Sequence, residues 1–206
     1  MAREIPISWH SFGGWFLGHS IGTGHKNVEI RTAQYRTSFD SAACLRLAKG
    51  FVIAKIQNQR TLLRRNWKGE DKPDDLVEAF QQDVRHAQRA GNLAELLGAE
   101  GQAAARYFRH FSAMLSREGD AASLAFDFST RNRRPPTDPV NALLSYAYAL
   151  LARSWTVALT AVGFDPYRGF YHQPRYGRPA LAVDMMEPFR PLLAASRVIQ
   201  ALNNGV

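Results

Sequence analysis

A helical spacing of apolar residues constrains the fold of this chain more than any other feature. It begins near Thr32 and lasts to about Trp67, with apolar side chains at intervals of three, four and seven: Leu45, Ala48, Val52, Ile56 and Leu63. Such spacing places one apolar stripe along a helix. The other face carries Arg46, Lys49, Lys55, Gln57, Arg60, Arg64 and Arg65. This face is either simply solvated or follows a row of phosphates.

The rest of the chain predicts more helices after a β-like start. Three short strands are expected in the first part, around residues 5–9, 15–17 and 28–30. Further helices are predicted over 75–90, 92–115, 138–162, 180–187 and 191–204, with Asp138 as an N-cap before Pro139. We therefore expect a mainly α protein, with a short β-rich segment over residues 1–31 that serves packing or dimerisation, and a multi-helix domain over residues 32–206.

The net charge indicates which kinds of partner the protein binds, and the cysteine content indicates the redox state of its compartment. The 206 residues carry 26 Lys and Arg against 18 Asp and Glu, a net charge of +8. That surplus favours a polyanionic partner, either nucleic acid or an anionic membrane surface. The single cysteine, Cys44, excludes an intrachain disulfide and fits a reducing compartment. No apolar run of membrane-spanning length and no signal-peptide pattern are found, so a cytoplasmic protein that does not span a membrane is expected.

Two carboxylates and a histidine near the C-terminal end are candidates for chemistry. Asp184 and Glu187 stand three residues apart in an apolar helical segment, so they share one face. Buried acids need a proton, a cation or a metal between them. The alternative is a solvated face paired with Arg178 or Arg190. His172 lies between turn residues and aromatics, and taken singly it would be a core histidine.

Glu100 is a third acidic candidate. It falls on the apolar stripe of the helix predicted over 92–115, and Gly101 follows it in mid-helix. A glycine there costs roughly 1 kcal/mol against alanine. A glutamate on the inner face, beside a glycine that permits close approach, suggests a ligand held inside the fold. The alternative is a surface glutamate at the edge of the stripe.

A basic loop and a polar row precede these acids. The loop holds three arginines before two prolines: Arg131, Arg133 and Arg134. A stiff loop suits phosphate contacts, because bidentate guanidinium binding needs a fixed fork. In the following helix a polar row either satisfies a buried network or points into a site: Asn141, Ser145 and Tyr148.

Several of these motifs occur together in one known family. They begin at Glu100 (EGQAAARYF), Asn132 (NRRPPTDPVNALLSY), Gly163 (GFDP), Gly169 (GFYH) and Asp184 (DMMEPFRP). The segments QYR at 34–36 and KIQNQR at 55–60 add to the match. In this order and spacing the motifs resemble the Cas1 family, the CRISPR-associated integrases of spacer acquisition. The resemblance covers most of the chain from residue 27 onward.

The resemblance implies a metal-dependent DNA integrase and endonuclease. In such enzymes a 3′-hydroxyl of a foreign DNA fragment attacks a phosphodiester at a CRISPR repeat. The implied ligands of Mn²⁺ or Mg²⁺ are Glu100, His172 and Glu187, with Asp184 as an auxiliary acid or an alternative ligand. Oxygen ligands with one imidazole suit these metals. The implied DNA contacts are Arg131, Arg133, Arg134, Arg178, Lys55 and Arg60, with Asn141 and Ser145 as supporting polar residues.

The resemblance also implies partners, and the chain departs from the family at both ends. Family members are cytoplasmic prokaryotic proteins that act on double-stranded DNA with free 3′-OH ends, without a membrane, and self-associate as dimers or tetramers. Their usual partner is the small protein Cas2, and the short length leaves open whether this chain depends on it. They usually open with a larger β-domain and continue beyond the FRP motif. The initial Met favours a compact member over a fragment. Two other functions remain open: a non-catalytic DNA-binding scaffold, and a metal-dependent hydrolase of a small phosphorylated substrate.

Overall fold

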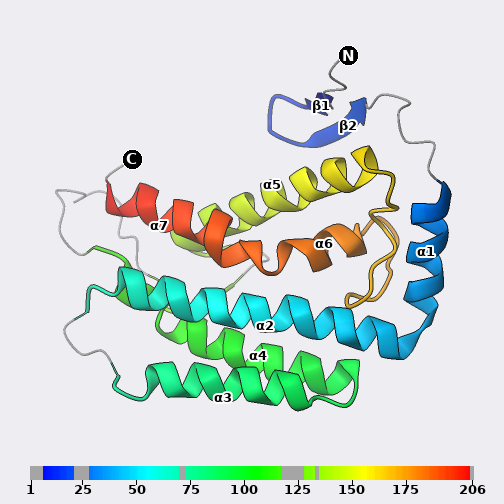
Figure 1. The fold of residues 1–206 in the computed structure, drawn as a ribbon. Coiled ribbons are helices and arrows are strands. Elements are labelled where there is room, and N and C mark those ends of the chain that lie inside the picture. The colour runs from blue at the N-terminus through cyan, green and yellow to red at the C-terminus, as the bar shows by residue number, and fades with distance from the viewer. Residues whose placement is uncertain (1–6, 21–27, 70–72, 117–127, 133–134, 205–206) are drawn as a thin grey trace, which may run out of the picture. The chain divides into compact units, whose positions relative to one another are not determined.

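A computed structural model describes residues 7–20, 28–69, 73–116, 128–132 and 135–204 (Figure 1). Helices dominate it, after one short β-hairpin. The elements are β1 (Ile7–His10), β2 (Phe16–Ser20), α1 (Val28–Phe39), α2 (Ser41–Asn66), α3 (Leu76–Arg89), α4 (Leu93–Arg109), α5 (Pro139–Ala161), α6 (Ala180–Met186) and α7 (Ser196–Asn203). A 3₁₀ turn (Phe111–Met114) follows α4, and a π-helical turn (Arg190–Ala195) precedes α7. The expectation of a mainly α protein with a short β start is confirmed.

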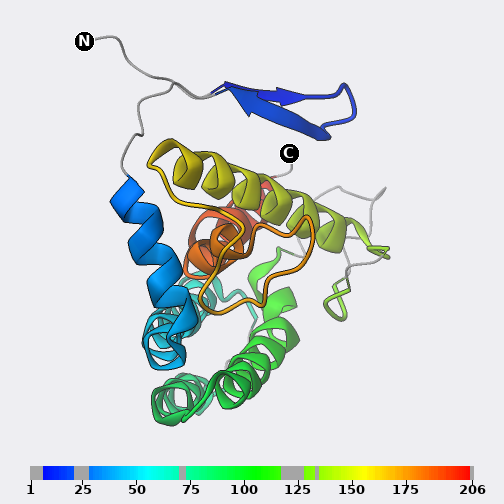
Figure 2. The same cartoon turned by 90° about the vertical axis from the view of Figure 1, so that its right-hand side faces the viewer.

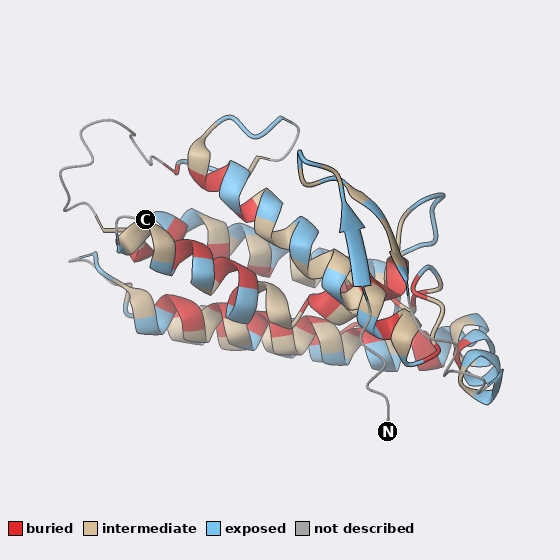
Figure 3. Cartoon of the chain, turned by 90° about the horizontal axis from the view of Figure 1, so that it is seen from above, coloured by how far each residue is buried: buried red, intermediate tan, exposed pale blue. Residues whose placement is uncertain are grey.

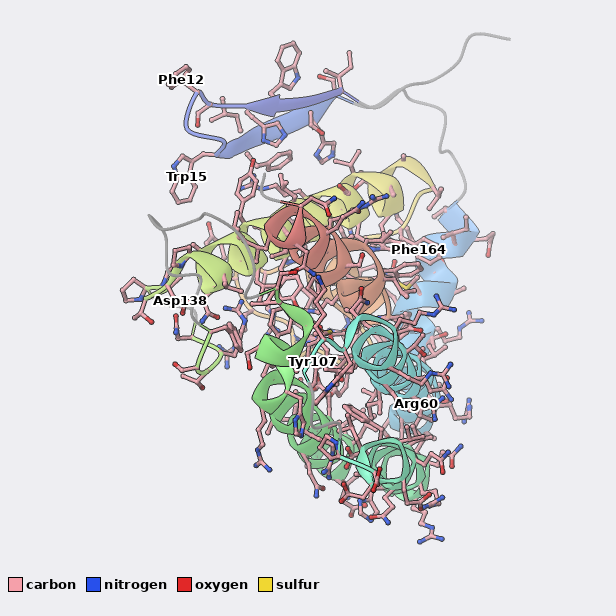
Figure 4. All side chains as sticks on the ribbon, turned by 90° about the vertical axis from the view of Figure 1, so that its left-hand side faces the viewer. Phe12, Trp15, Arg60, Tyr107, Asp138 and Phe164 are labelled. Carbon is pink, nitrogen blue, oxygen red and sulfur yellow. The ribbon has the colours of Figure 1, made fainter. Side chains whose placement is uncertain are left out.

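The described part of the N-terminal segment holds two strands, not three. β1 and β2 pair antiparallel, with Ile7 opposite Ser20 and Trp9 opposite Gly18. The strand predicted over 28–30 is wrong, because those residues form the first turn of α1. Hydrogen bonds from Arg31 and Gln34 to the backbone of residues 163–168 hold α1 and outweigh the local β-propensity of Val28 and Ile30. The hairpin is largely exposed (Figure 3), and Phe12 and Trp15 project from its turn end (Figure 4).

One long helix was expected from residue 32 to 67, and the structure breaks it at Asp40. The side chain of Asp40 accepts hydrogen bonds from the backbone N–H groups of Ala42 (2.9 Å) and Ala43 (3.1 Å). Its carbonyl accepts from Cys44 N–H. Asp40 is therefore the N-cap of α2, a signal that apolar periodicity alone does not reveal.

The later helices follow the predicted ranges closely. Asn92 caps α4 by accepting from Glu95 N–H, and Asp138 caps α5 by accepting from Asn141 N–H at 2.7 Å. The helix predicted over 92–115 ends at Arg109 and continues as the 3₁₀ turn. The segment after Pro188 is helical as predicted, although its first turn is wound as a π-helix.

The chain forms two compact units, which differ from the division at residue 31 suggested by the sequence. The first comprises residues 1–48 and 150–186, and the second comprises residues 49–149 and 187–206. The boundaries fall inside α2 and α5, so each of these helices contributes to both units.

Gln34 of α1 organises the first unit. It is 3% exposed, and its Nε2 donates to the carbonyl oxygens of Asp165 and Arg168, both at 2.7 Å. Its Oε1 accepts from Asp165 N–H at 2.9 Å. Arg31 adds a bond to the carbonyl of Gly163. One buried amide thus fixes the turn that leads into the predicted histidine loop. The adjoining apolar core consists of Leu159, Leu181 and Ala182, with Trp155, Phe164, Phe170 and Met185 packed against them.

The second unit contains the α3–α4 pair, which lies side by side in Figure 2. On α3 the buried residues recur every three or four positions and include Phe80 and Asp83. Asp83 is 1% exposed and accepts from Arg106 of α4 at 2.9 Å. Tyr107 and Phe111 complete this core with an edge-to-face ring contact. One stripe of each helix is buried, as in amphipathic helices, but on α4 it runs through Leu96 and Ala103, whereas Leu97, which the sequence placed on the stripe, is exposed.

Among the described residues, one helix is long and apolar enough to cross a membrane by length and composition. It is α5, and 22% of its most apolar window is buried. This qualifies the expectation that no apolar run reaches that length. Core helices of other proteins meet the same criterion, and α5 carries Asn141 and Ser145, which bind the side chain of Arg131.

Replacing the cap of α2 should destabilise the protein measurably. We expect Asp40→Ala to lower the free energy of unfolding by about 1 kcal/mol, since two backbone N–H groups lose their acceptor. Urea unfolding followed by circular dichroism measures this. The matched control is Asp75→Ala, because Asp75 stands at the N-cap of α3 without a side-chain cap bond. Equal losses in the two variants would contradict the capping role of Asp40.

Candidate active site

Two glutamates of the second unit meet around one lysine. Lys55, on α2, forms ion pairs with Glu100 of α4 and with Glu187, the residue after α6. Its Nζ lies 2.6 Å from Oε2 of Glu187. The side chains are 10%, 13% and 2% exposed, in that order. The inner-face interpretation of Glu100 is therefore confirmed, and the solvated-face alternative for Glu187 is wrong.

Lys55 contributes a fixed positive charge to this group. Burial by itself lowers the pKa of its ammonium, but Glu187 and Glu100 outweigh burial, so the pKa lies above its usual value. Arg190 pairs with the second oxygen of Glu187 at 2.9 Å. The sequence named Arg190 as a possible partner of the acids, and the structure confirms that pairing in a buried setting. Two carboxylates and two cations give a neutral cluster.

Tyr148 links this cluster to the arginine loop. The guanidinium of Arg190 lies 5.0 Å from the centre of its ring, and that of Arg131 lies 5.7 Å from it. Both distances fall within the range of cation–π attraction. Burial raises the pKa of the Tyr148 hydroxyl. The sequence placed Tyr148 on a polar face of its helix, but gave no sign that two arginines would share its ring.

Arg131 is held by the polar row of α5. Its guanidinium donates to Asn141 Oδ1 at 2.5 Å and to Ser145 Oγ at 3.1 Å. Asn141 is fully buried and also donates to the carbonyl of Thr130 and to Asp138. Although burial opposes it, these bonds from Asn141 hold the pKa of Asp138 below its usual value. Of the two interpretations of the polar row, the structure shows the buried network.

In the first unit, Asp184 holds the loop that carries His172. Its Oδ2 accepts from the backbone N–H groups of Phe170 (2.6 Å) and Tyr171 (2.9 Å). Its Oδ1 accepts from the N–H of His172 at 2.8 Å and contacts the ring Nδ1 of His172 at 2.7 Å. Asp184 is fully buried. With Nδ1 engaged by a carboxylate, Nε2 is the nitrogen with which His172 could bind a metal.

Close packing around Asp184 explains a glycine in the loop. A Cβ atom at Gly169 would lie 2.7 Å from Asp184 Oδ2 and 2.9 Å from the carbonyl carbon of Ala180. Neither atom belongs to the end of a long flexible side chain, so the loop itself would have to shift. Gly169 thus allows Asp184 to reach three successive N–H groups. Since both Asp184 oxygens are used in this way, Asp184 acts as a positioning residue for His172.

The structure brings the predicted acids and histidine together as two pairs. Glu100 and Glu187 meet around Lys55 in the second unit, and His172 meets Asp184 in the first. Within the described ranges, no group of three or more His, Cys, Asp or Glu side chains is arranged to hold a metal ion. The three-residue ligand set of Glu100, His172 and Glu187 therefore stays a prediction.

Two expectations from the sequence are wrong. Lys55 was placed on the exposed basic face of α2, but it is buried because its long side chain reaches inward to the carboxylates. Gly101 was interpreted as permitting a close approach, but it is exposed, and a Cβ atom there would meet nothing within 4 Å. Glu100 is held inside the fold by its ion pair with Lys55, and Gly101 has no part in this.

The other predicted DNA contacts are distributed over both units. Arg60 lies on α2 and is half-buried (Figure 4). Arg178 lies in a tight turn closed by its own N–H to the carbonyl of Arg175, with Gly177 at φ +70°. Arg133 and Arg134 lie outside the described residues. On α2, Arg64 and Arg65 are exposed.

Comparison with known proteins decides the family. The family described as CRISPR associated protein Cas1 matches residues 1–206. The chain belongs to the Cas1 family. A Cas4/Cas1 fusion of Geobacter sulfurreducens, described as an exonuclease and endonuclease, is 64% identical over 209 residues, which is 100% of this chain and 37% of that relative.

Solved structures agree with the Cas1 assignment. A casposase bound to an integration product superimposes with a TM-score of 0.79 at 27% identity, over 98% of this chain and 55% of the other. A chain of a partial Cas6-RT-Cas1–Cas2 complex gives a TM-score of 0.81 at 28% identity, over 98% and 59%. The chain thus spans between a third and three fifths of the length of these Cas1 relatives.

Two glycine substitutions should act in opposite directions. We expect Gly169→Ala to lower the free energy of unfolding by about 1–3 kcal/mol, because the added methyl group overlaps Asp184 and the backbone of Ala180. Gly101→Ala should raise it by about 0.5–1 kcal/mol, because alanine suits a helix interior and space is free there. Urea titrations of both variants beside the wild type measure the difference. A neutral Gly169→Ala variant would refute the close packing around Asp184.

Proposed function

We propose that the chain carries the metal-dependent DNA-joining site of a CRISPR integrase. The observation that carries the proposal is the convergence of Glu100 and Glu187, from α4 and from the end of α6, on a single cation inside the second unit. Membership in the Cas1 family supports it, and so does the likeness to a casposase bound to an integration product.

Two carboxylates and one imidazole, from Glu100, Glu187 and His172, are suitable ligands for Mn²⁺ or Mg²⁺. Two largely buried glutamates already share one positive charge, and carboxylate oxygens are the ligands that these hard cations prefer. Glu100 and Glu187 would hold the ion, with His172 as the third ligand through Nε2. When bound, the ion would stabilise negative charge on the reacting phosphate and favour deprotonation of the attacking hydroxyl.

The protein residues would orient the reactants. A 3′-hydroxyl oxygen of the incoming fragment forms a bond to the phosphorus of a repeat phosphodiester, and the bond from phosphorus to the 3′ oxygen of the cut strand breaks. The departing strand keeps that oxygen as a new 3′-OH, so the number of phosphodiester bonds is unchanged. Arg190 fixes the orientation of Glu187, and Asp184 fixes that of His172. No covalent link to the protein forms.

The proposed partners are DNA and other protein chains. A duplex fragment with free 3′-OH ends and a repeat-containing target are the substrates, and the net charge of +8 favours both. Cas2 is proposed as a protein partner, because a similar Cas1 chain occurs in a Cas6-RT-Cas1–Cas2 complex. Self-association is proposed as well. The predicted contacts of Arg60 and Arg178 with DNA belong to this proposal.

Removing a proposed ligand should abolish strand joining. We expect His172→Ala and Glu187→Gln each to lower the rate of Mn²⁺-dependent joining of a short duplex to a repeat-containing plasmid by at least about 100-fold. Asp184→Asn should lower it by roughly 10- to 100-fold, because it loosens the histidine without removing it. Gel separation of joined products measures the rate, with and without added Cas2.

The matched control is Glu78→Gln, which breaks an exposed ion pair with Arg85 on α3. It should leave joining unchanged. DNA binding by all variants should persist, since the proposed phosphate contacts are intact. If wild-type protein binds DNA but never joins it, even with Mn²⁺ and Cas2, the catalytic proposal fails and a DNA-binding scaffold takes its place.

A further inference from the structure

Lys55 occupies the space between the two glutamates that are proposed to bind the metal. Its ammonium pairs with both Glu100 and Glu187, the two oxygen ligands assigned to the metal. The lysine is largely buried, and no part of the joining chemistry described above uses it. Removing one partner of a buried ion pair leaves the other charge uncompensated, which is strongly destabilising.

Lys55 and a divalent ion would need the same oxygens. The Lys55 Nζ lies 2.6 Å from Oε2 of Glu187, and Mg²⁺ binds carboxylate oxygens at about 2.0–2.1 Å. An ion bound to Oε2 and to Glu100 would therefore lie within a few ångströms of the ammonium. The two glutamates, Lys55 and Arg190 already form a neutral group. Two further positive charges beside the ammonium would be strongly repelled.

We propose that Lys55 is a built-in counter-ion that takes the metal's place between Glu100 and Glu187, and that a divalent ion must displace it to bind. This rests on the proposed metal-dependent function and adds a residue to it. Arg190 holds Oε1 of Glu187, while Lys55 holds Oε2. The exchange therefore concerns one oxygen of Glu187, and Arg190 keeps that side chain oriented while it occurs.

This arrangement has two consequences for the energetics. Without metal, Lys55 offsets the repulsion between two buried carboxylates, so removing its charge should destabilise the metal-free fold. With metal, part of the binding free energy is used to displace the ammonium, so the apparent affinity is weaker than that of the glutamates alone. Lys55 thus sets the metal concentration at which the site fills.

The first test is Mn²⁺ binding by Lys55→Met, which removes the ammonium and keeps most of the side-chain length. We expect the variant to bind Mn²⁺ about tenfold more tightly than the wild type, by titration calorimetry. Its metal-free melting temperature should be lower, and added Mn²⁺ should raise that temperature more than it does in the wild type. The matched control is Lys49→Met, six residues before Lys55 on α2, whose ammonium donates to the carbonyl of Gln88. It should leave the Mn²⁺ affinity unchanged.

A second measurement uses the wild type and does not depend on whether the variant folds. Acetic anhydride acetylates accessible lysines, and mass spectrometry reads the extent at each position. We expect Lys55 to be protected without metal and to become several-fold more reactive as Mg²⁺ is added, because the ammonium leaves its ion pairs. Lys49 serves as the internal control, and the extent of its acetylation should not change when Mg²⁺ is added.

The outcomes separate the two proposals. Tighter Mn²⁺ binding by Lys55→Met together with metal-dependent labelling of Lys55 supports displacement, and the labelling decides alone where the variant does not fold. If wild type and Lys55→Met bind Mn²⁺ equally, or if Lys55 stays protected at saturating Mg²⁺, displacement is wrong while the metal-dependent function stands. If folded wild type binds neither ion at millimolar concentration, the proposed function fails and this inference fails with it.

Discussion

Two ionised carboxylates buried side by side repel each other unless a positive charge lies between them, and the second unit places Lys55 there. α2 supplies Lys55, α4 supplies Glu100, and the chain just beyond α6 supplies Glu187, so three segments distant in sequence meet at one charge. Arg190 neutralises the remaining oxygen of Glu187. The ring of Tyr148 lies within cation–π distance of both Arg190 and Arg131, and so connects this cluster to the arginine loop.

In the first unit, a histidine on a loop without regular secondary structure is held in place by hydrogen bonds. Asp184 does so by accepting three successive backbone N–H groups and contacting the imidazole, in the space that Gly169 leaves open. Gln34 fixes the turn just upstream. The loop is therefore held by hydrogen bonds to side chains in place of regular backbone pairing. Such support is what a metal-binding histidine needs to keep one tautomer and one direction.

Positive charge serves two purposes in this chain, and sequence alone does not separate them. Lys55, Arg106, Arg131 and Arg190 are engaged inside the fold, with carboxylates, amides or aromatic rings. Arg64 and Arg65 face solvent. A count of basic residues therefore overstates the charge available to a polyanion. Long side chains make this division hard to foresee, because a lysine can turn its ammonium inward or outward from the same helical position.

The sequence by itself determined the helical class, most helix ranges and the cap at Asp138, and it singled out the acids and the histidine as candidate site residues. These follow from periodicity, local capping chemistry and motif order, all of which act over a few residues. Only the tertiary structure decided that Val28 begins a helix, that Lys55 lies between Glu100 and Glu187, and that Asp184 positions His172. Each of these depends on contacts between segments more than ten residues apart, and local sequence carries no record of which segments will meet.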